Sequence, residues 1–173
     1  MPRPQFHVYI ALSADGYIAR ADGAIDWLAP FDSEEYGYDD FTAELGAIVM
    51  GRTTFDQLLG FGEWPYQTLK TYVMTSSPPG ELPEGVEAVS ESPTALAEKL
   101  SGKEPQNIWV VGGGALIQSF LKEGLIDRMD LFVMPLMLGS GIRLFGADGP
   151  AQELSLKDSK TYENGAVMLR YET

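Results

Sequence analysis

Residues 108–121 read IWVVGGGALIQSFL, and this stretch decides the fold class. A run of apolar, mostly strand-forming residues passes through three consecutive glycines into a segment with helical spacing. Strands that are apolar without interruption are typical of parallel sheets that are covered on both faces. We therefore predict a buried strand, a tight turn that contains Gly112, Gly113 and Gly114, and a helix.

Strand and helix patterns alternate on both sides of this unit. Two helices carry start signals: Ser92 with Pro93 precedes one, and Thr53 with Asp56 is a partial capping box for another. Such alternation predicts an α/β fold with a mostly parallel central sheet flanked by helices. The expected strands are 5–12, 47–51, 71–75, 107–112 and 128–135, and the expected helices are 33–45, 53–60, 93–101 and 114–123.

The C-terminal part departs from this alternation. Residues 154–172 read LSLKDSKTYENGAVMLRYE, which is two alternating runs joined by Asn164 and Gly165. An Asn-Gly pair between such runs is a strong signal of a β-hairpin. We therefore expect an antiparallel hairpin at the C-terminal end of the sheet. The length of 173 residues suits one domain spanning 1–173.

Composition excludes several classes of function. The chain has no cysteine, which excludes disulfides, thiolate metal sites and cysteine nucleophiles, and we expect no metal. A formal net charge of −13 opposes binding to nucleic acid or to anionic membranes. No apolar run has membrane-spanning length and no signal peptide is visible, so we expect a cytoplasmic protein.

Residues that could perform chemistry by themselves are scarce. His7 is the only histidine, and its position inside the first expected strand favours a packed or edge residue. A serine hydrolase would need that histidine as its base, and the G-x-S-x-G nucleophile motif is missing. A protein of this kind can still be an enzyme if a cofactor carries the reactive atom.

The three glycines have two interpretations. Backbone N–H groups at the start of a helix attract anions, and glycines let a diphosphate approach the backbone closely. Alternatively, the glycines only avoid a steric clash in a tight turn. The spacing does not match G-x-G-x-x-G, so a Rossmann domain is not indicated.

Two further strand ends carry groups that suit phosphate. Gly51 and Arg52 follow the strand at 47–51, and an arginine beside a helix start favours bidentate phosphate recognition. The alternative for Arg52 is a surface ion pair with a carboxylate. The hydroxyls of residues 75–77 follow the strand at 71–75, although hydroxyls in turns usually bond the backbone. Together the three turns predict a long anionic ligand across one edge of the sheet.

Four stretches in this order carry a resemblance to a known family: ALSADGYIARADGAIDWL, IVMGRTTF, VVGGGALIQSFL and PLMLGSGIRLF. Together they resemble the dihydrofolate reductase superfamily, and within it the riboflavin-biosynthesis reductases of the RibD C-terminal domain group. The resemblance covers nearly the whole chain. It implies a dihydrofolate-reductase-like fold that binds NADPH in an extended form, and a homodimer.

The resemblance also implies roles for particular residues. The segment from Asp15 to Trp27 would lie near the nicotinamide, as would Ala11. Independently of the resemblance, Tyr17 and Trp27 are expected to line the substrate pocket, because flat heterocycles stack on aromatic rings, with core packing as the alternative and Trp64 undecided. The implied cofactor-binding residues are Ala11, Gly51, Arg52, Thr53, Thr54, Thr75, Ser76, Ser77, Gly112, Gly113 and Gly114.

The expected reaction is hydride transfer from NADPH to a pterin-like or ribosylaminopyrimidine-type substrate, with reduction of 5-amino-6-(5-phosphoribosylamino)uracil in riboflavin biosynthesis as one candidate. Asp26 is the preferred proton donor, ahead of Asp15 or ordered water. Ile25 stands where riboflavin-pathway reductases usually carry serine, and Glu35 lies near the position of the pterin-anchoring carboxylate of dihydrofolate reductases. A dihydrofolate or pterin reductase, a non-catalytic NADPH-binding protein and a structural interaction module therefore remain alternatives.

Overall fold

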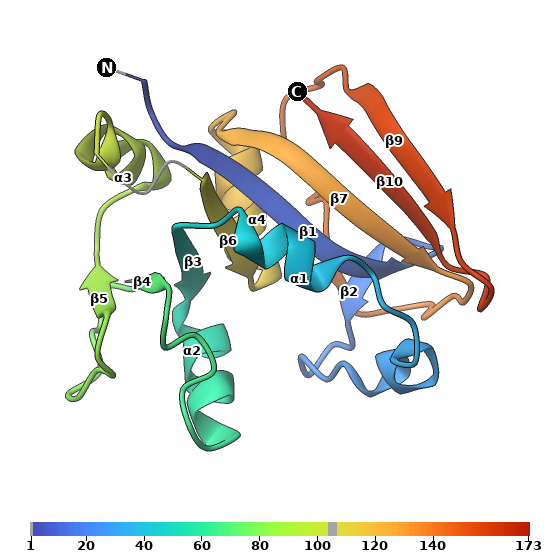
Figure 1. The fold of residues 1–173 in the computed structure, drawn as a ribbon, viewed down its shortest axis with the longest axis horizontal. Helices are drawn as coiled ribbons and strands as arrows, with labels where there is room; N and C mark the ends of the chain where they lie inside the picture. Colours follow the sequence, from blue (N-terminus) through green and yellow to red (C-terminus); the bar gives the residue numbers. More distant parts are fainter. Residues whose placement is uncertain (1, 104–106) are drawn as a thin grey trace.

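An eight-stranded sheet forms the centre of the molecule. The structure, a computed structural model, describes residues 2–103 and 107–173. The strand order is β5–β4–β3–β6–β1–β7–β10–β9 (Figure 1). Its strands are β1 (Gln5–Ser13), β3 (Ala47–Gly51), β4 (Lys70–Met74), β5 (Val86–Val89), β6 (Asn107–Gly112), β7 (Ile126–Met134), β9 (Ser155–Thr161) and β10 (Val167–Glu172).

The sheet is parallel except at one edge. Neighbouring strands pair in parallel from β5 across to β7, and β10 then pairs antiparallel with β7 and with β9. The turn between β9 and β10 contains Asn164, whose Oδ1 accepts a hydrogen bond from the N–H of Ala166. The predicted α/β class and the predicted C-terminal hairpin are both confirmed.

Helices cover both faces of the parallel part. On β3, Ile48 packs with the apolar residues of α1 (Tyr38–Ala43) and α2 (Arg52–Gly60). Val49, the next residue, packs with those of α3 (Pro93–Leu100) and α4 (Gly114–Lys122). Because successive side chains of a strand point to opposite faces, the two helix pairs lie on opposite sides of the sheet.

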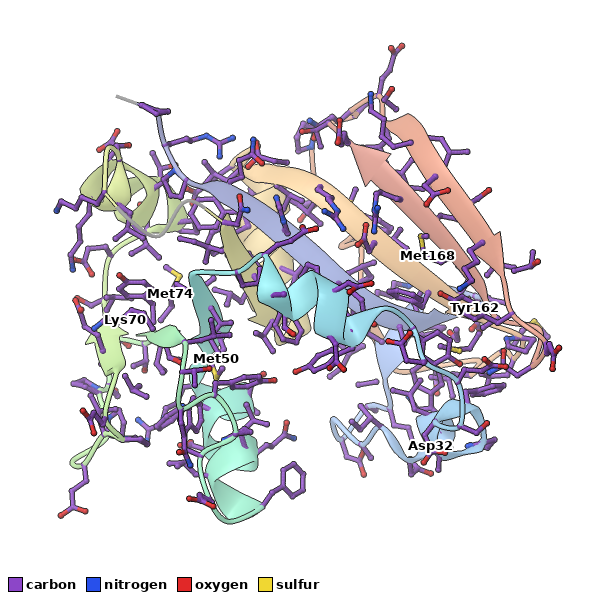
Figure 2. All side chains as sticks on the ribbon, in the orientation of Figure 1. Asp32, Met50, Lys70, Met74, Tyr162 and Met168 are labelled. Atoms are coloured by element: carbon purple, nitrogen blue, oxygen red, sulfur yellow. The ribbon has the colours of Figure 1, made fainter. Side chains whose placement is uncertain are left out.

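The face beneath α1 is rich in aromatic rings. Tyr9 of β1 stacks on Phe41 at 4.6 Å between centroids and contacts Phe132 at the same distance. From there the apolar layer continues to the hairpin, where Met168 of β10 and Tyr162 at its turn lie (Figure 2). Aromatic pairs at these separations add to the energy of apolar burial. This layer therefore joins the hairpin to the rest of the fold.

One charged group lies deep in this face. Asp130 of β7 is only 1% exposed, and its carboxylate accepts hydrogen bonds from Arg128 and Arg170 at 2.7–3.1 Å. Burial raises the pKa of Asp130, but the hydrogen bonds from the two arginines outweigh it and hold the pKa below its usual range. Arg128 also pairs with Glu44 at the end of α1. The cluster therefore links the hairpin, β7 and α1.

Some local elements differ from those expected. The helix expected at 33–45 is shortened to Tyr38–Ala43 and is preceded by a 3₁₀ helix, η1 (Asp26–Phe31). Glu35 accounts for the late start, because its carboxylate accepts the N–H groups of Gly37 and Tyr38. Two very short strands, β2 (Tyr17–Ala19) and β8 (Ile142–Arg143), pair with each other in a separate small sheet.

The helix starts were predicted with mixed success. The prediction for α3 is confirmed, because the Ser92 side chain accepts the N–H of Ala95 and Pro93 opens the helix. The prediction that Thr53 caps α2 is wrong. That helix starts from Gly51 without a side-chain cap, and Asp56 pairs with Arg52 instead of completing a capping box.

Candidate functional site

The carboxyl ends of β4, β3 and β6 meet at one edge of the sheet. These three strands are neighbours, and the register places Gly51 opposite Met74 on one side and Met50 opposite Gly112 on the other. In Figure 1, α2 lies below the carboxyl end of β3. The three turns that we predicted to share one edge are therefore brought together.

The three consecutive glycines differ in how strictly their positions require glycine. Gly112 has a φ of +133°, which side-chain-bearing residues rarely adopt. A Cβ on Gly114 would lie 2.8 Å from Cγ2 of Ile142, so packing excludes it. A Cβ on Gly113 would meet only Oγ1 of Thr54, at an ordinary contact distance of 3.7 Å. Contacts within the described protein therefore explain Gly112 and Gly114 but leave room for a side chain at Gly113.

Gly51 adjoins this open position. A Cβ there would lie 3.9 Å from the carbonyl oxygen of Gly112 and from the nitrogen of Gly113, so space is available here too. Gly51 and Gly113 are the N-cap residues of α2 and α4, and neither helix has a side-chain cap. Serine or aspartate would cap these helices better than glycine does. The two helix starts thus form a surface of backbone without Cβ atoms, which fits an anionic ligand.

Arg52 lies at the side of this surface that faces β4. Its Nε donates to both carboxylate oxygens of Asp56 at 2.9 and 3.0 Å, and its Nη1 donates to the carbonyl oxygen of Ser77. The N–H of Ser77 donates to Oγ1 of Thr75 at 3.1 Å, and Ser76 is exposed. The surface ion pair that we considered for Arg52 is therefore present, and it holds the guanidinium against the turn of residues 75–77.

Asp15 serves as a structural tie. Its carboxylate accepts the hydroxyl of Ser13 at 2.6 Å and the N–H groups of Leu138 and Gly139. The hydrogen bond from Ser13 is the main cause of a pKa below the usual range. Asp15 is thus an ionised acceptor that joins the turn after β1 to the loop after β7, and proton donation by it would break these bonds.

Asp26 is exposed and paired. Its carboxylate accepts hydrogen bonds from Arg20 at 2.7 and 3.2 Å, and the hydrogen bond to this arginine lowers the pKa of Asp26. A proton donor needs a pKa near the working pH. Proton transfer from Asp26 therefore requires that its pair with Arg20 opens, and its catalytic role stays a prediction.

The aromatic candidates lie in different environments. Trp27 is 4% exposed and packs with Phe132 and Met168, and the partly buried Ala11 packs against the same cluster. Trp64 is buried beside Phe55 in the cluster under α2. Both tryptophan rings thus contact protein in this conformation. Their Nε1 atoms have no hydrogen-bond partner among the described residues. Roles for Ala11 and Trp27 in ligand binding stay predictions.

Tyr17 is half-buried and lies on β2. The guanidinium of Arg143 is 4.9 Å from the centre of its ring, and Nη2 of Arg143 donates to its hydroxyl at 3.3 Å. Ile18, the next residue of β2, and Leu144, just after β8, are both buried in the core that includes the apolar residues of α4. The role of Tyr17 in substrate binding also stays a prediction.

His7 lies away from the glycine edge. It is 4% exposed beside a hollow of about 350 Å³ at the amino ends of β1 and β6. Burial, followed by the nearby charge of Arg128, lowers the pKa of His7. The prediction that His7 is a packed residue is confirmed. Among the described residues no group of His, Cys, Asp or Glu could hold a metal, and no helix is long and apolar enough to cross a membrane.

Replacing Asp26 by Asn tests its predicted role. If Asp26 supplies the proton, turnover of the true substrate should fall about a hundredfold, since general acid catalysis of this kind contributes roughly 10²–10⁴. NADPH affinity should stay nearly unchanged. Asp22→Asn is a matched control, because within the described parts of the chain the Asp22 side chain accepts a hydrogen bond only from the N–H of Ala24, in the same exposed segment. Unaltered turnover of Asp26→Asn in steady-state assays would remove Asp26 from the mechanism.

The chain matches known proteins over most of its length. The family model described as the RibD C-terminal domain matches residues 63–168, which is more than half of the chain. The uncharacterized protein YwjB of Bacillus subtilis is 39% identical over 166 residues, which cover 95% of each chain. The chain belongs to the RibD C-terminal domain family.

Two further similar proteins have names that refer to riboflavin biosynthesis. A Shewanella sp. PV-4 protein provisionally assigned to riboflavin biosynthesis has a crystal structure with a TM-score of 0.86 and 31% identity, covering 97% of this chain and 98% of that one. The riboflavin biosynthesis protein RibD of Corynebacterium ammoniagenes is 26% identical over 155 residues. That match covers 81% of this chain but only 45% of the relative.

Sequence reasoning missed two contacts at the site of this RibD C-terminal domain. The first is the identity of the carboxylate that pairs with Arg52: it is Asp56, which the spacing of four residues on a helix could have revealed. The second lies between the segment after β2 and α2: a Cβ on Gly23 would be 3.4 Å from Nε2 of Gln57. No periodic signal predicts this second contact, because Gly23 lies in an irregular turn.

Proposed function

We propose that the protein is an NADPH-dependent reductase that transfers a hydride to a small pterin-like or ribosylaminopyrimidine-type substrate. The observation that carries the proposal is the surface formed by Gly51 and Gly113. Neither position is required to be glycine by protein contacts, and both lie at uncapped helix starts on the carboxyl edge of parallel strands. The carboxyl ends of parallel strands are where open α/β sheets bind ligands.

The residues around this surface form two groups, which would contact different parts of an extended dinucleotide. Arg52 and the turn of residues 75–77 would hold the ribose and its 2′-phosphate, because the guanidinium already reaches that turn. Thr54 and the glycines would hold the diphosphate, because Oγ1 of Thr54 adjoins Gly113. When bound, NADPH would supply the hydride. The protein would orient the cofactor and the substrate against each other.

The substrate is proposed by family. Membership of the RibD C-terminal domain family, and the riboflavin biosynthesis relatives, favour a pyrimidine reductase-like activity. Reduction of 5-amino-6-(5-phosphoribosylamino)uracil is the specific candidate. A pterin reductase is less favoured, because Glu35 already accepts two N–H groups at the start of α1. A cytoplasmic homodimer remains part of the proposal.

Titration with NADPH and NADH, followed by fluorescence of the cofactor, tests the proposal. Arg52→Ala should weaken NADPH binding by about ten- to a hundredfold, because charge-assisted hydrogen bonds are worth roughly 1.5–3 kcal/mol. NADH, which lacks the 2′-phosphate, should lose less affinity. Lys157→Ala is a control, since this cation pairs with Glu172 on the hairpin. If the wild-type protein binds neither cofactor, the proposal is wrong.

A non-catalytic NADPH-binding protein is the second candidate function. This function is favoured because the two candidate proton donors, Asp15 and Asp26, are both ionised and hydrogen-bonded to other residues. Oxidation of NADPH, measured by absorbance with a panel of pterins and ribosylaminopyrimidines, separates the two. Binding without oxidation of NADPH by any member of the panel would favour this second candidate.

A further inference from the structure

Arg52 is held from two sides. Asp56, one helical turn further along α2, engages Nε with both of its oxygens, and the Ser77 carbonyl oxygen engages Nη1. The first contact comes from the helix and the second from the turn after β4. Together they fix the long side chain so that it reaches from the end of β3 to the turn after β4, the adjacent strand.

The remaining donors of Arg52 point to a ligand. A guanidinium has five N–H donors, and these contacts use the Nε–H and one N–H of Nη1. Among the described residues Arg52 makes no further hydrogen bond. The free donors belong to Nη1 and Nη2, which form the edge that grips a phosphate with two parallel hydrogen bonds. Asp56 thus occupies the edge of the guanidinium that such a phosphate would not use.

The pair contributes little as a surface ion pair. The side chains of Arg52 and Asp56 are 37% and 52% exposed, and exposed pairs of this kind hardly stabilise a fold. Repulsion between the carboxylate and a phosphate is also weakened by solvent at such positions. Holding a flexible arginine in place before the ligand arrives, in contrast, improves binding by reducing the ordering cost. The benefit of holding Arg52 in place therefore outweighs the repulsion between the Asp56 carboxylate and a phosphate.

We infer that Asp56 is a positioning residue that makes the site selective for the 2′-phosphate of the cofactor. It holds the guanidinium of Arg52 against the turn of residues 75–77 and leaves Nη2 and one N–H of Nη1 for the phosphate. This inference rests on the proposed function, because it names how the same site distinguishes NADPH from NADH. It predicts that the carboxylate of Asp56 improves NADPH binding although both groups are negative.

The test measures dissociation constants for NADPH and NADH by titration of four proteins: wild type, Asp56→Asn, Asp56→Glu and Glu172→Gln. Asp56→Asn should weaken NADPH binding about two- to tenfold, the effect of losing one preorganised side chain. NADH binding should stay within about twofold, since the 2′-phosphate contact is the part that changes. Asp56→Glu should retain the wild-type preference, because glutamate can also reach Arg52 from the same turn of the helix.

Glu172→Gln is the matched control for charge. It removes one exposed carboxylate from a pair with Lys157 on the hairpin and should change neither constant. Tighter NADPH binding in Asp56→Asn would mean that the carboxylate competes with phosphate, and would overturn the inference. Equal losses for both cofactors would overturn it as well. Wild-type protein that binds both cofactors equally would overturn the inference alone, and wild type that binds neither would overturn the proposed function with it.

Discussion

Asp130→Asn should lower the free energy of unfolding by about 3–5 kcal/mol, the usual cost of removing one partner of a buried ion pair. The Asp130 carboxylate is 1% exposed and accepts hydrogen bonds from two arginines. The amide has nearly the same shape but lacks the charge, so Arg128 would remain largely buried beside a neutral group. Urea denaturation monitored by tryptophan fluorescence measures the change.

Two further measurements make this prediction specific. Asp26→Asn removes an exposed carboxylate from a pair with Arg20 and should leave the free energy of unfolding nearly unchanged. The second measurement is the pH dependence. The pKa of Asp130 is lowered in the folded state, so its contribution is present above the unfolded pKa of about 3.9 and is lost as the pH falls through the folded value. This acid-dependent part should be missing in Asp130→Asn, and equal effects of the two variants would contradict the prediction.

Gly113→Ala should weaken NADPH binding about tenfold or more and leave the stability of the fold unchanged. A methyl group fits the described structure, since its nearest atom is Oγ1 of Thr54 at 3.7 Å. Alanine caps a helix less well than glycine, but the stiffer unfolded chain offsets this by about 0.4–1 kcal/mol. The methyl group would instead occupy the space of a ligand that contacts the backbone, and forced overpacking typically costs about 1–3 kcal/mol.

Gly112→Ala is the neighbouring control, because this variant should change the stability of the fold, which Gly113→Ala should not. The φ of +133° at Gly112 is unfavourable for alanine, so the free energy of unfolding should fall by about 1–3 kcal/mol. The pair of variants, compared by thermal unfolding and by NADPH titration, separates architecture from ligand contact. Wild-type NADPH affinity in Gly113→Ala would show that no ligand approaches the backbone at that position.

The main elements of the fold could be predicted because their signals are local. An uninterrupted apolar run marked β6, and Asn164 with Gly165 marked the hairpin. Contacts between distant residues could not be predicted in this way. The small sheet pairs Tyr17 with Arg143, and strands of three and two residues are too short for any periodicity. The start of α1 depends on the Glu35 side chain. Its carboxylate accepts the N–H groups of Gly37 and Tyr38, and these hydrogen bonds replace the helical ones that would start the helix earlier.

The candidate site shows the same division. The order of glycines, Arg52 and hydroxyls along the chain predicted that three turns share one edge, because parallel strands place their carboxyl ends together. The reason for each glycine required coordinates, since Ile142, which crowds Gly114, is 28 residues away in sequence. The cluster around Asp130 was missed although a charged residue between Met129 and Leu131 was a visible signal. The lowered pKa values of Asp15 and Asp26 depend on hydrogen bonds to partners that no sequence motif specifies.

The position of β1 in the sheet has a consequence for synthesis of the chain. This first strand lies between β6 and β7, whose pairing residues follow about 100 and 120 residues later. During translation at about 5–20 residues per second, both hydrogen-bonding edges of β1 therefore stay unpaired for roughly 5–20 seconds, and the edge that pairs with β7 for roughly 6–24 seconds. Strands β3 to β5 can pair with each other earlier, because they are consecutive neighbours. The nascent protein thus exposes an apolar strand until most of the chain has left the ribosome, and binding by chaperones is most useful to it in that interval.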